Sequence, residues 1–219
     1  MYFSGFFIFI RSMCCRLRLD LRELRKKSGG FFGSGESTGS VGVVTINIPR
    51  IAYLAENEDD FYRRLDKMMD ISARSLSIKR KIITKLLDEG LYPYTKRYLG
   101  TFENHFSTIG LLGMNEAGLN ANWVKADMTD PKCQQFAKDV LNHMRERLSD
   151  YQEQYGDLYN LEATPAESTS YRLAKHDVKR YPGIITASKE TPYYTNSSHL
   201  PVGYTEDVFA ALDIQDELQ

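Results

Sequence analysis

Cysteine is scarce in this sequence, and the spacing of its three cysteines excludes the common disulfide and zinc sites. Cys14 and Cys15 are adjacent, and Cys133 is remote from both. Adjacent cysteines bridge poorly because a disulfide has demanding geometry, and a tetrahedral zinc site usually needs spaced pairs of ligands. Cys14 and Cys15 are therefore either a packed apolar pair or include a thiol that does chemistry. An odd number of cysteines also fits a reducing cytosol better than secretion.

The sequence also lacks an excess of charge of one sign and a long hydrophobic run. Its 28 basic and 29 acidic side chains give a net charge of -1, so nothing predicts a nucleic-acid groove. The apolar opening, residues 1–10, is too short to span a bilayer, which takes about 20 residues, and Arg11 follows it where a signal peptide would place positive charge before it. We interpret it as a buried strand or a damaged chain start. We expect no nucleic-acid partner, no membrane anchor and a cytoplasmic location.

The four histidines do not form a recognisable set of metal ligands. His105 lies in ENHFS, and we expect His143 on the exposed side of a helix and His176 and His199 in polar loops. With no C-x-x-C pair either, we expect this chain to bind no metal or cofactor of its own.

Glycine and serine mark one internal boundary. Residues 28–40, SGGFFGSGESTGS, have the composition of a flexible loop. We therefore divide the chain into residues 1–40, which carry the adjacent cysteines, and residues 41–219, which carry the periodic segments.

The second part alternates between predicted strands and helices. Residues 41–50 form a continuous β-branched run ended by proline, as in a strand buried on both faces. A long amphipathic helix follows over about 57–89, with Asn57 as its cap and Gly90 as its stop. FSTIGLLGMNEAGLNA then predicts a buried strand followed by the start of a helix.

The rest of the chain continues the alternation. Asp130 and Pro131 predict the start of a further helix that ends at Gly156 and buries Cys133 as a small core residue. LYNLEATPAE predicts another buried strand, and TPYYTNSSHLPVGYT a polar loop. This order indicates an α/β fold with mostly parallel strands.

Five separate blocks, in order along the chain, resemble the anaerobic, class III glycyl-radical ribonucleoside-triphosphate reductases. The resemblance runs from about Arg11 to the C-terminus, and its blocks are MCCRLRLDL, GVVTINIPRIAYL, GLYPYTKRYLGTFENHFSTIGLLGMNEA, NLEATPAESTSYRLAKHD and YYTNSSHLPVGYT. It implies a ten-stranded α/β barrel, of which this chain would supply part of the second half, with a finger loop through its centre.

The resemblance also implies a reaction that makes DNA precursors. A cysteine at the tip of the finger loop becomes a thiyl radical, generated by a glycyl radical that a separate iron–sulfur and S-adenosylmethionine activase installs. The thiyl removes the 3′ hydrogen of a ribonucleoside triphosphate and the 2′ hydroxyl leaves as water. Formate or a small thiol protein supplies the electrons. The family further implies a homodimer, an ATP-binding regulatory module and a C-terminal zinc site.

Carried over by position, the resemblance assigns roles to residues near the start of the chain. The family places the radical cysteine directly before an arginine, which selects Cys15, with Cys14 beside it as a packing neighbour that we group with the substrate-binding residues. Asn47 is expected to hold the ribose hydroxyls, since a carboxamide both donates and accepts hydrogen bonds. The alternative is that Asn47 satisfies backbone groups at the end of its strand.

Further candidates lie late in the chain. Thr195, Asn196, Ser197 and Ser198 form a loop that can hold the substrate phosphates through backbone amides and hydroxyls, although a plain capped turn is an equal alternative. Glu162 is a candidate for substrate contact, with a role in strand-end structure as the alternative. Glu162 and Glu167 together are weak grounds for an acid–base pair.

Departures from the family pattern leave a second hypothesis open. Neither the N-terminal barrel half nor the C-terminal glycyl-radical loop with its zinc cysteines is recognisable, and Ser168 stands where the family usually has glycine. We therefore expect an internal piece of the catalytic subunit that is inactive alone. The alternatives are a non-catalytic fragment, such as an aggregation-prone half barrel or an assembly partner, and a related glycyl-radical enzyme of the formate-lyase type.

Overall fold

The structure is a computed structural model that describes residues 10–13, 17–20, 38–216 and 218. Its core is a parallel sheet in the order β3-β4-β5, and β1 and β2 form a separate antiparallel pair. The strands are β1 Ile10–Met13, β2 Leu17–Asp20, β3 Gly39–Asn47, β4 His105–Leu112 and β5 Leu158–Glu162. The helices are α2 Ile48–Leu54, α3 Glu58–Asp88, α4 Pro93–Tyr98, α5 Met114–Asn120, α6 Pro131–Tyr155, α7 Glu167–Arg180 and α8 Val208–Asp216.

The two long helices begin and end at the signals that the sequence predicts. The Asn57 side chain accepts from the Asp60 amide at 2.9 Å at the start of α3, and the Asp130 side chain accepts from the Lys132 amide at 2.8 Å at the start of α6. Gly156 ends α6 with a φ of 72°, a left-handed conformation that glycine adopts without strain. The prediction of both helices is confirmed.

One proline and one helix were misinterpreted from the sequence. Pro49 does not end the strand: β3 stops at Asn47, and Pro49 lies in the first turn of α2, where its missing amide costs nothing. Helix α7 was not predicted, so His176 lies on an exposed helical face and not in a loop. Strand β3 also begins at Gly39, two residues inside the predicted loop 28–40, while residues 28–37 fall outside the described part.

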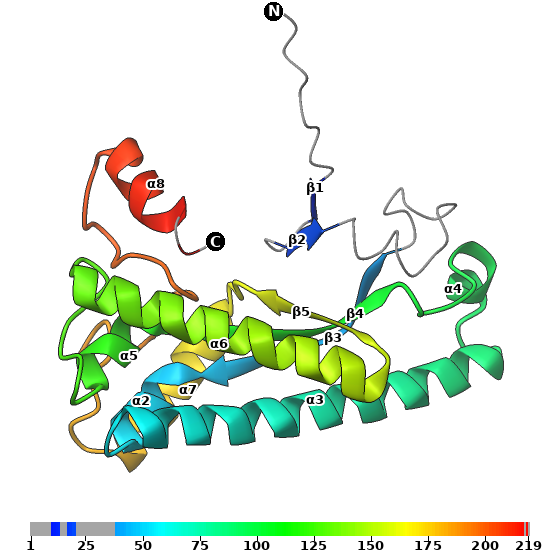
Figure 1. Ribbon diagram of the computed structural model, residues 1–219, viewed down its shortest axis with the longest axis horizontal. Coiled ribbons are helices and arrows are strands. Elements are labelled where there is room, and N and C mark those ends of the chain that lie inside the picture. The colour runs from blue at the N-terminus through cyan, green and yellow to red at the C-terminus, as the bar shows by residue number, and fades with distance from the viewer. Residues whose placement is uncertain (1–9, 14–16, 21–37, 217, 219) are drawn as a thin grey trace, which may run out of the picture.

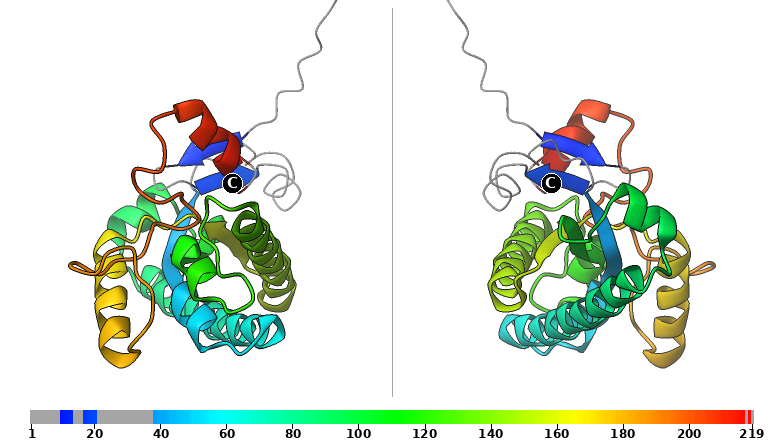
Figure 2. Two further views of the ribbon diagram at one scale, coloured as in Figure 1. Left: turned by 90° about the vertical axis from the view of Figure 1, so that its left-hand side faces the viewer. Right: turned by 90° about the vertical axis from the view of Figure 1, so that its right-hand side faces the viewer.

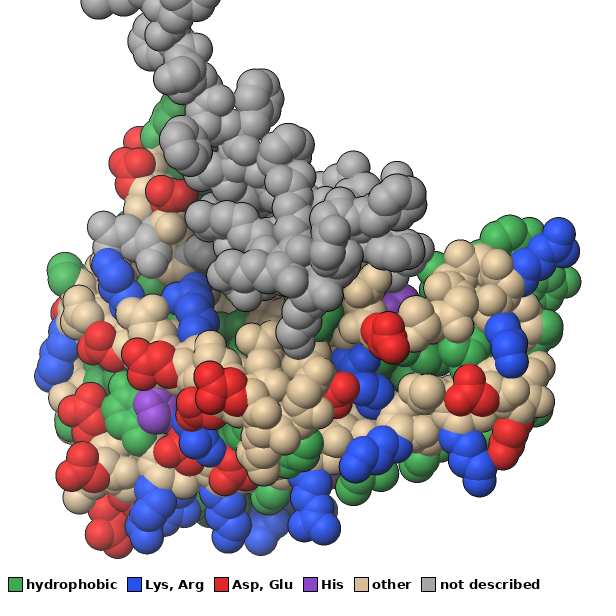
Figure 3. Space-filling view, turned by 45° about the vertical axis from the view of Figure 1, so that its right-hand side comes forward, with side chains coloured by type: hydrophobic (Ala, Val, Ile, Leu, Met, Phe, Trp, Pro, Cys, Tyr) green, Lys and Arg blue, Asp and Glu red, His purple; other side chains and the backbone are tan. Residues whose placement is uncertain are grey.

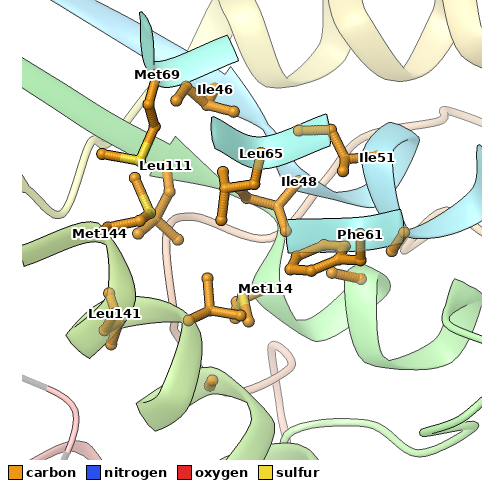
Figure 4. Close-up of a cluster of buried hydrophobic side chains, with 14 of the residues drawn as sticks. Ile46, Ile48, Ile51, Phe61, Leu65, Met69, Leu111, Met114, Leu141 and Met144 are labelled. Carbon is orange, nitrogen blue, oxygen red and sulfur yellow. The ribbon is translucent and has the colours of Figure 1, made fainter. Parts of the chain in front are cut away.

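Helices α3 and α6 cover one face of the sheet, and α7 lies on the other side (Figures 1 and 2). Side chains alternate between the two faces of each strand, so Ile46 and Leu111 point to α3 and α6 (Figure 4). Ile109 belongs to the same hydrophobic core. On α3, the fully buried Phe61 ring lies 5.2 Å from that of Phe136 on α6. Cys133 is buried in this core, as predicted, and burial raises its pKa to about 12.

Acidic and basic side chains are mixed over the outer surface of the two long helices (Figure 3). His143 on α6 contributes to the contact between α3 and α6. Its Nε2 lies 2.7 Å from Asp66 Oδ1 on α3, and its ring centroid is 4.7 Å from that of Tyr62. The prediction of an exposed His143 was therefore wrong, because its side of α6 borders α3.

In the part of the chain that the structure describes, no helix has the length and apolarity needed to cross a membrane.

Replacing Phe61 with alanine tests where the core lies. Phe61→Ala empties a fully buried ring position and should lower the free energy of unfolding by about 3–5 kcal/mol. Ile82→Ala, at a position on the same helix that is 53% exposed, should change it by about 0.5 kcal/mol or less. Denaturant unfolding of both variants measures the difference, and equal losses would contradict this assignment of the core.

Candidate functional site at the carboxyl edge of the sheet

The predicted site residues on the sheet lie at one edge. Strands β3, β4 and β5 are parallel, so their carboxyl ends meet there, and in open α/β sheets this is the edge where ligands bind. Asn47 is the last residue of β3 and Glu162 the last of β5. The loop that contains Thr195 reaches the end of β4, because the Gly113 amide donates to the Thr195 carbonyl at 2.9 Å.

Both polar atoms of the Asn47 side chain are already engaged. Its Oδ1 accepts from the Arg50 amide at 3.2 Å and so caps α2, while its Nδ2 donates to Asp177 Oδ2 at 2.7 Å. Asn47 therefore satisfies a backbone group at the end of its strand, as the alternative interpretation of the sequence expected. One Nδ2 hydrogen and one Oδ1 lone pair remain for a ligand, so capping and substrate contact are compatible.

Asp177 on α7 is a buried carboxylate that sequence reasoning missed. Its side chain has no exposed surface, and Oδ1 lies 2.6 Å from both Nε and Nη2 of Arg50. Oδ2 accepts from Asn47 Nδ2 and from the Tyr194 hydroxyl, the latter at 2.8 Å. The signal was the block SYRLAKHD, in which Ala174 and Asp177 lie one helical turn apart on the buried side of α7.

Helix α5 holds the loop that follows Tyr194. The Met114 amide donates to the Ser197 carbonyl at 2.9 Å. Glu116, also without exposed surface, accepts from the Thr195 amide at 2.8 Å and from the Thr195 hydroxyl at 2.7 Å. The donor hydrogen of the Thr195 hydroxyl is therefore directed at Glu116, and Thr195 anchors the loop.

The next three residues leave their backbone amides free. Within the described residues, the amides of Asn196, Ser197 and Ser198 have no hydrogen-bond acceptor. Ser197 has a φ of 41°, in the left-handed region that a non-glycine residue rarely adopts. Consecutive amides around a left-handed residue form a concavity that binds anions. Ser197 and Ser198 are 1% and 2% exposed, so their backbone and side-chain atoms are both largely shielded from solvent.

The face of the sheet opposite α3 and α6 carries several polar side chains, alongside the buried Leu112 that packs with Ala174 and Tyr194. The Thr108 hydroxyl on β4 hydrogen-bonds to Ser40 Oγ on β3 and donates to Asn160 Oδ1 on β5, both at 2.9 Å. Asn160 Nδ2 and the Thr164 hydroxyl are buried and have no partner among the described residues. Glu162 lies on this face two residues beyond Asn160 and is 6% exposed.

Burial raises the pKa of Glu162 above its usual range. No described residue forms a hydrogen bond or ion pair with its carboxyl group, so no partner offsets the loss of hydration. Glu167, in the first turn of α7, is exposed. The two carboxyl groups are in different environments, which gives no support to an acid–base pair.

One cavity lies away from the candidate site. A cavity of about 800 Å³ lies near the amino end of β5 and contains none of the predicted site residues; Arg80 and Lys81 of α3 and Asp157 are among those that line it. Within the described part of the chain, no three histidine, cysteine, aspartate or glutamate side chains are grouped to hold a metal ion. Cys14 and Cys15 lie between β1 and β2, outside the described residues.

Fold and site together define an α/β protein with a parallel sheet whose carboxyl edge carries a loop with free backbone amides. A family model described as anaerobic ribonucleoside-triphosphate reductase matches residues 3–219. The chain belongs to this family.

The matches to curated relatives cover most of this chain but only a part of each relative. The anaerobic ribonucleoside-triphosphate reductase of Haemophilus influenzae is 28% identical over 208 residues, and that of Enterobacteria phage T4 is 26% identical over 186 residues. These matches cover 84% and 76% of this chain and 29% of each relative. The chain thus spans about 30% of the length of the curated relatives it matches.

Solved structures show the same fold. The anaerobic ribonucleotide reductase from Thermotoga maritima with citrate in the active site gives a TM-score of 0.69 at 23% identity, over 84% of this chain and 34% of that one. The same enzyme in complex with dATP and CTP gives a TM-score of 0.68 at 23% identity, over 84% of this chain and 31% of that one. The predicted α/β fold with a parallel sheet is confirmed.

Gly110 tests the close contact between β4 and the segment after β5. A Cβ at Gly110 would lie 1.7 Å from Thr164 Oγ1 and 3.0 Å from the Glu162 carbonyl oxygen. Gly110→Ala should therefore destabilise the fold by about 1–3 kcal/mol. Adding Thr164→Ala should recover part of that loss, because it removes the nearest atom. A double-mutant cycle from denaturant unfolding measures the coupling, and simple additivity would contradict the contact.

Glu162→Gln tests the electrostatic state of the polar face. Because the pKa of Glu162 is raised in the folded state, the folded protein binds more protons than the unfolded protein. The contribution of Glu162 to the free energy of unfolding is therefore full at low pH and is lost as the pH rises through the folded pKa. Glutamine resembles the neutral acid, so the variant should be more stable than wild type at neutral pH and no more stable at pH 4. Unfolding measured from pH 4 to 8 checks this, with the exposed Glu167→Gln as control. A neutral-pH loss in Glu162→Gln would refute it.

Proposed function

We propose that this chain is part of the catalytic subunit of an anaerobic ribonucleotide reductase, which converts ribonucleoside triphosphates to deoxyribonucleoside triphosphates by thiyl-radical chemistry. The observation that carries the proposal is the family match over residues 3–219, which includes every candidate site residue. The share of each relative that the chain covers fits a component of a larger catalytic unit.

The sheet supports membership of a ten-stranded barrel. Among the described strands, β3 and β5 each pair on one side only, so both have an outer edge that a further strand can extend. The main apolar face is covered by α3 and α6, and the polar part of the opposite face, around Thr108 and Asn160, would then line the interior of the barrel. Residues 1–40 would supply the finger-loop segment and residues 41–219 part of the second barrel half.

Within this proposal, the triphosphate lies on the loop of Thr195, Asn196, Ser197 and Ser198. The three free amides provide donors for phosphate oxygens, and Thr195 fixes the loop to α5. One solved relative is described as a complex with dATP and CTP, two nucleoside triphosphates. The phosphate-binding role therefore rests mainly on the backbone of this loop.

The ribose end of the substrate would lie near Asn47 and Glu162. Asn47 has one donor and one acceptor left to hold ribose hydroxyls without a change of charge. Glu162 has no hydrogen-bond or ion-pair partner among the described residues, so its carboxyl group is available for contact with the substrate. Cys15 would carry the thiyl that takes the 3′ hydrogen, with Cys14 beside the substrate, and the 2′ hydroxyl leaves as water.

The longer subunit would supply the glycyl radical, which an iron–sulfur and S-adenosylmethionine activase installs, together with a zinc site and ATP binding. It would form a homodimer in the cytoplasm and receive electrons from formate or a small thiol protein. A non-catalytic fragment is the second candidate, favoured by the 29% coverage of the relatives and by the unpaired sheet edges.

The test compares Cys15 with Cys133 in the longer subunit, assayed anaerobically with its activase. Cys15→Ala should abolish nucleotide reduction with folding intact, because it removes the thiol that we assign to exchange a hydrogen atom with the ribose. Cys133→Ala, at a buried core position, should stay active. An active Cys15→Ala would show that the radical residue has been misassigned.

The two candidate functions are separated by assaying the 219-residue chain first alone and then together with the complementary part of the subunit. With activase present, this chain should show no turnover under either candidate. Turnover restored by the complementary part of the subunit would support the enzyme component, and self-association without restored turnover would support the non-catalytic fragment.

A further inference from the structure

One carboxylate on α7 contacts both halves of the candidate site. Oδ2 of Asp177 accepts from Asn47, which we assign to the ribose, and from Tyr194, which precedes the phosphate loop. We infer that Asp177 is a positioning residue that sets the orientation of the Asn47 amide and anchors the loop 194–198. This inference rests on the proposed function for the roles of Asn47 and the loop.

Asp177 defines which way the Asn47 amide points. A buried carboxylate only accepts, so the amide nitrogen must face it, and the Arg50 amide only donates, so the amide oxygen must face Arg50. The flipped amide would set two acceptors against each other and two donors against each other. The free hydrogen and the free lone pair of Asn47 therefore have fixed directions before a ligand arrives.

Tyr194 links Asp177 to the loop. Its side chain is 1% exposed, and its hydroxyl donates to Asp177. Ser170, two turns earlier on α7, donates to the Tyr194 carbonyl at 2.6 Å and accepts from its amide at 3.0 Å. Helix α7 thus holds Tyr194 by backbone and side chain, and the next residue, Thr195, is held by Glu116 of α5. The free amides follow directly after these two anchors.

The carboxylate is required because all its partners donate. Arg50 occupies Oδ1, and Asn47 and Tyr194 share Oδ2. An asparagine at this position would turn an N–H group toward one pair of donors. Because Asn47 and Tyr194 share one oxygen, a change at Tyr194 is expected to reach the amide of Asn47.

The experiment uses Tyr194→Phe and Asp177→Asn in the 219-residue chain. Tyr151→Phe is the matched control, because the Tyr151 hydroxyl donates to Asp70 at 2.6 Å in the α3–α6 contact, with Arg147 close by. Tripolyphosphate and ATP binding are measured by calorimetry. Nuclear magnetic resonance follows the Asn47 side-chain amide and the exchange of the Gly113 and Met114 amides, which donate to loop carbonyls.

Tyr194→Phe should weaken binding of both anions by about tenfold, which corresponds to the loss of one buried hydrogen bond to a charged group. It should also shift the Asn47 side-chain signals and speed exchange at Gly113 and Met114. Asp177→Asn should weaken anion binding, shift the Asn47 signals and speed amide exchange more strongly than Tyr194→Phe does. Tyr151→Phe should change none of these readouts, although it loses comparable stability.

The outcomes separate this inference from the proposed function. If Tyr194→Phe leaves the Asn47 signals and both exchange rates at wild-type values, positioning by Asp177 is refuted, whatever the anions do. If these readouts change as expected but the wild-type chain binds neither anion, the positioning stands and the phosphate site is refuted. An Asp177→Asn chain that fails to fold leaves the decision to Tyr194→Phe.

Discussion

A carboxylate without exposed surface must be surrounded by donors, and the carboxyl edge of this sheet is arranged around that requirement at Asp177. Removing a charge from water is costly unless hydrogen bonds and opposite charge replace the hydration. Asp177 obtains them from Arg50 and Asn47 at the start of α2 and from Tyr194 in the late loop. Segments remote in sequence therefore meet at one place, because only together do they satisfy this group.

The two faces of the sheet differ in the polarity of their side chains. The face under α3 and α6 is apolar and supplies the main core around Phe61 and Leu111. The other face carries hydroxyl, amide and carboxyl groups, including Thr108, Asn160 and Glu162. Buried polar groups are normally paired, and unpaired ones call for a reason such as a ligand or a further segment of chain. The free donor of Asn160 fits a face that is completed by something other than the described residues.

Much of the fold could be predicted from local signals. Caps such as Asn57 and Asp130 act within one helical turn, so their residues alone reveal them. Helix α2 was missed because Pro49 ends a strand and begins a helix with the same lack of an amide. His143 was placed in solvent because periodicity assigns a face to one helix without showing the neighbour, here Asp66 of α3.

The candidate site was harder, because its decisive contacts join residues far apart in sequence. Asn47 and Asp177 are 130 positions apart, and Glu116 and Thr195 are 79 apart. Residue type identified Asn47 and the loop as candidates, but only the fold shows that Thr195 is an anchor and that the next three backbone amides have no acceptor among the described residues. Side-chain chemistry can be read from sequence, whereas free backbone amides are visible only once every acceptor has been placed. A phosphate site built from backbone, as we propose for this loop, therefore leaves a weak trace in the amino-acid sequence, and here that trace is the short polar run TNSS.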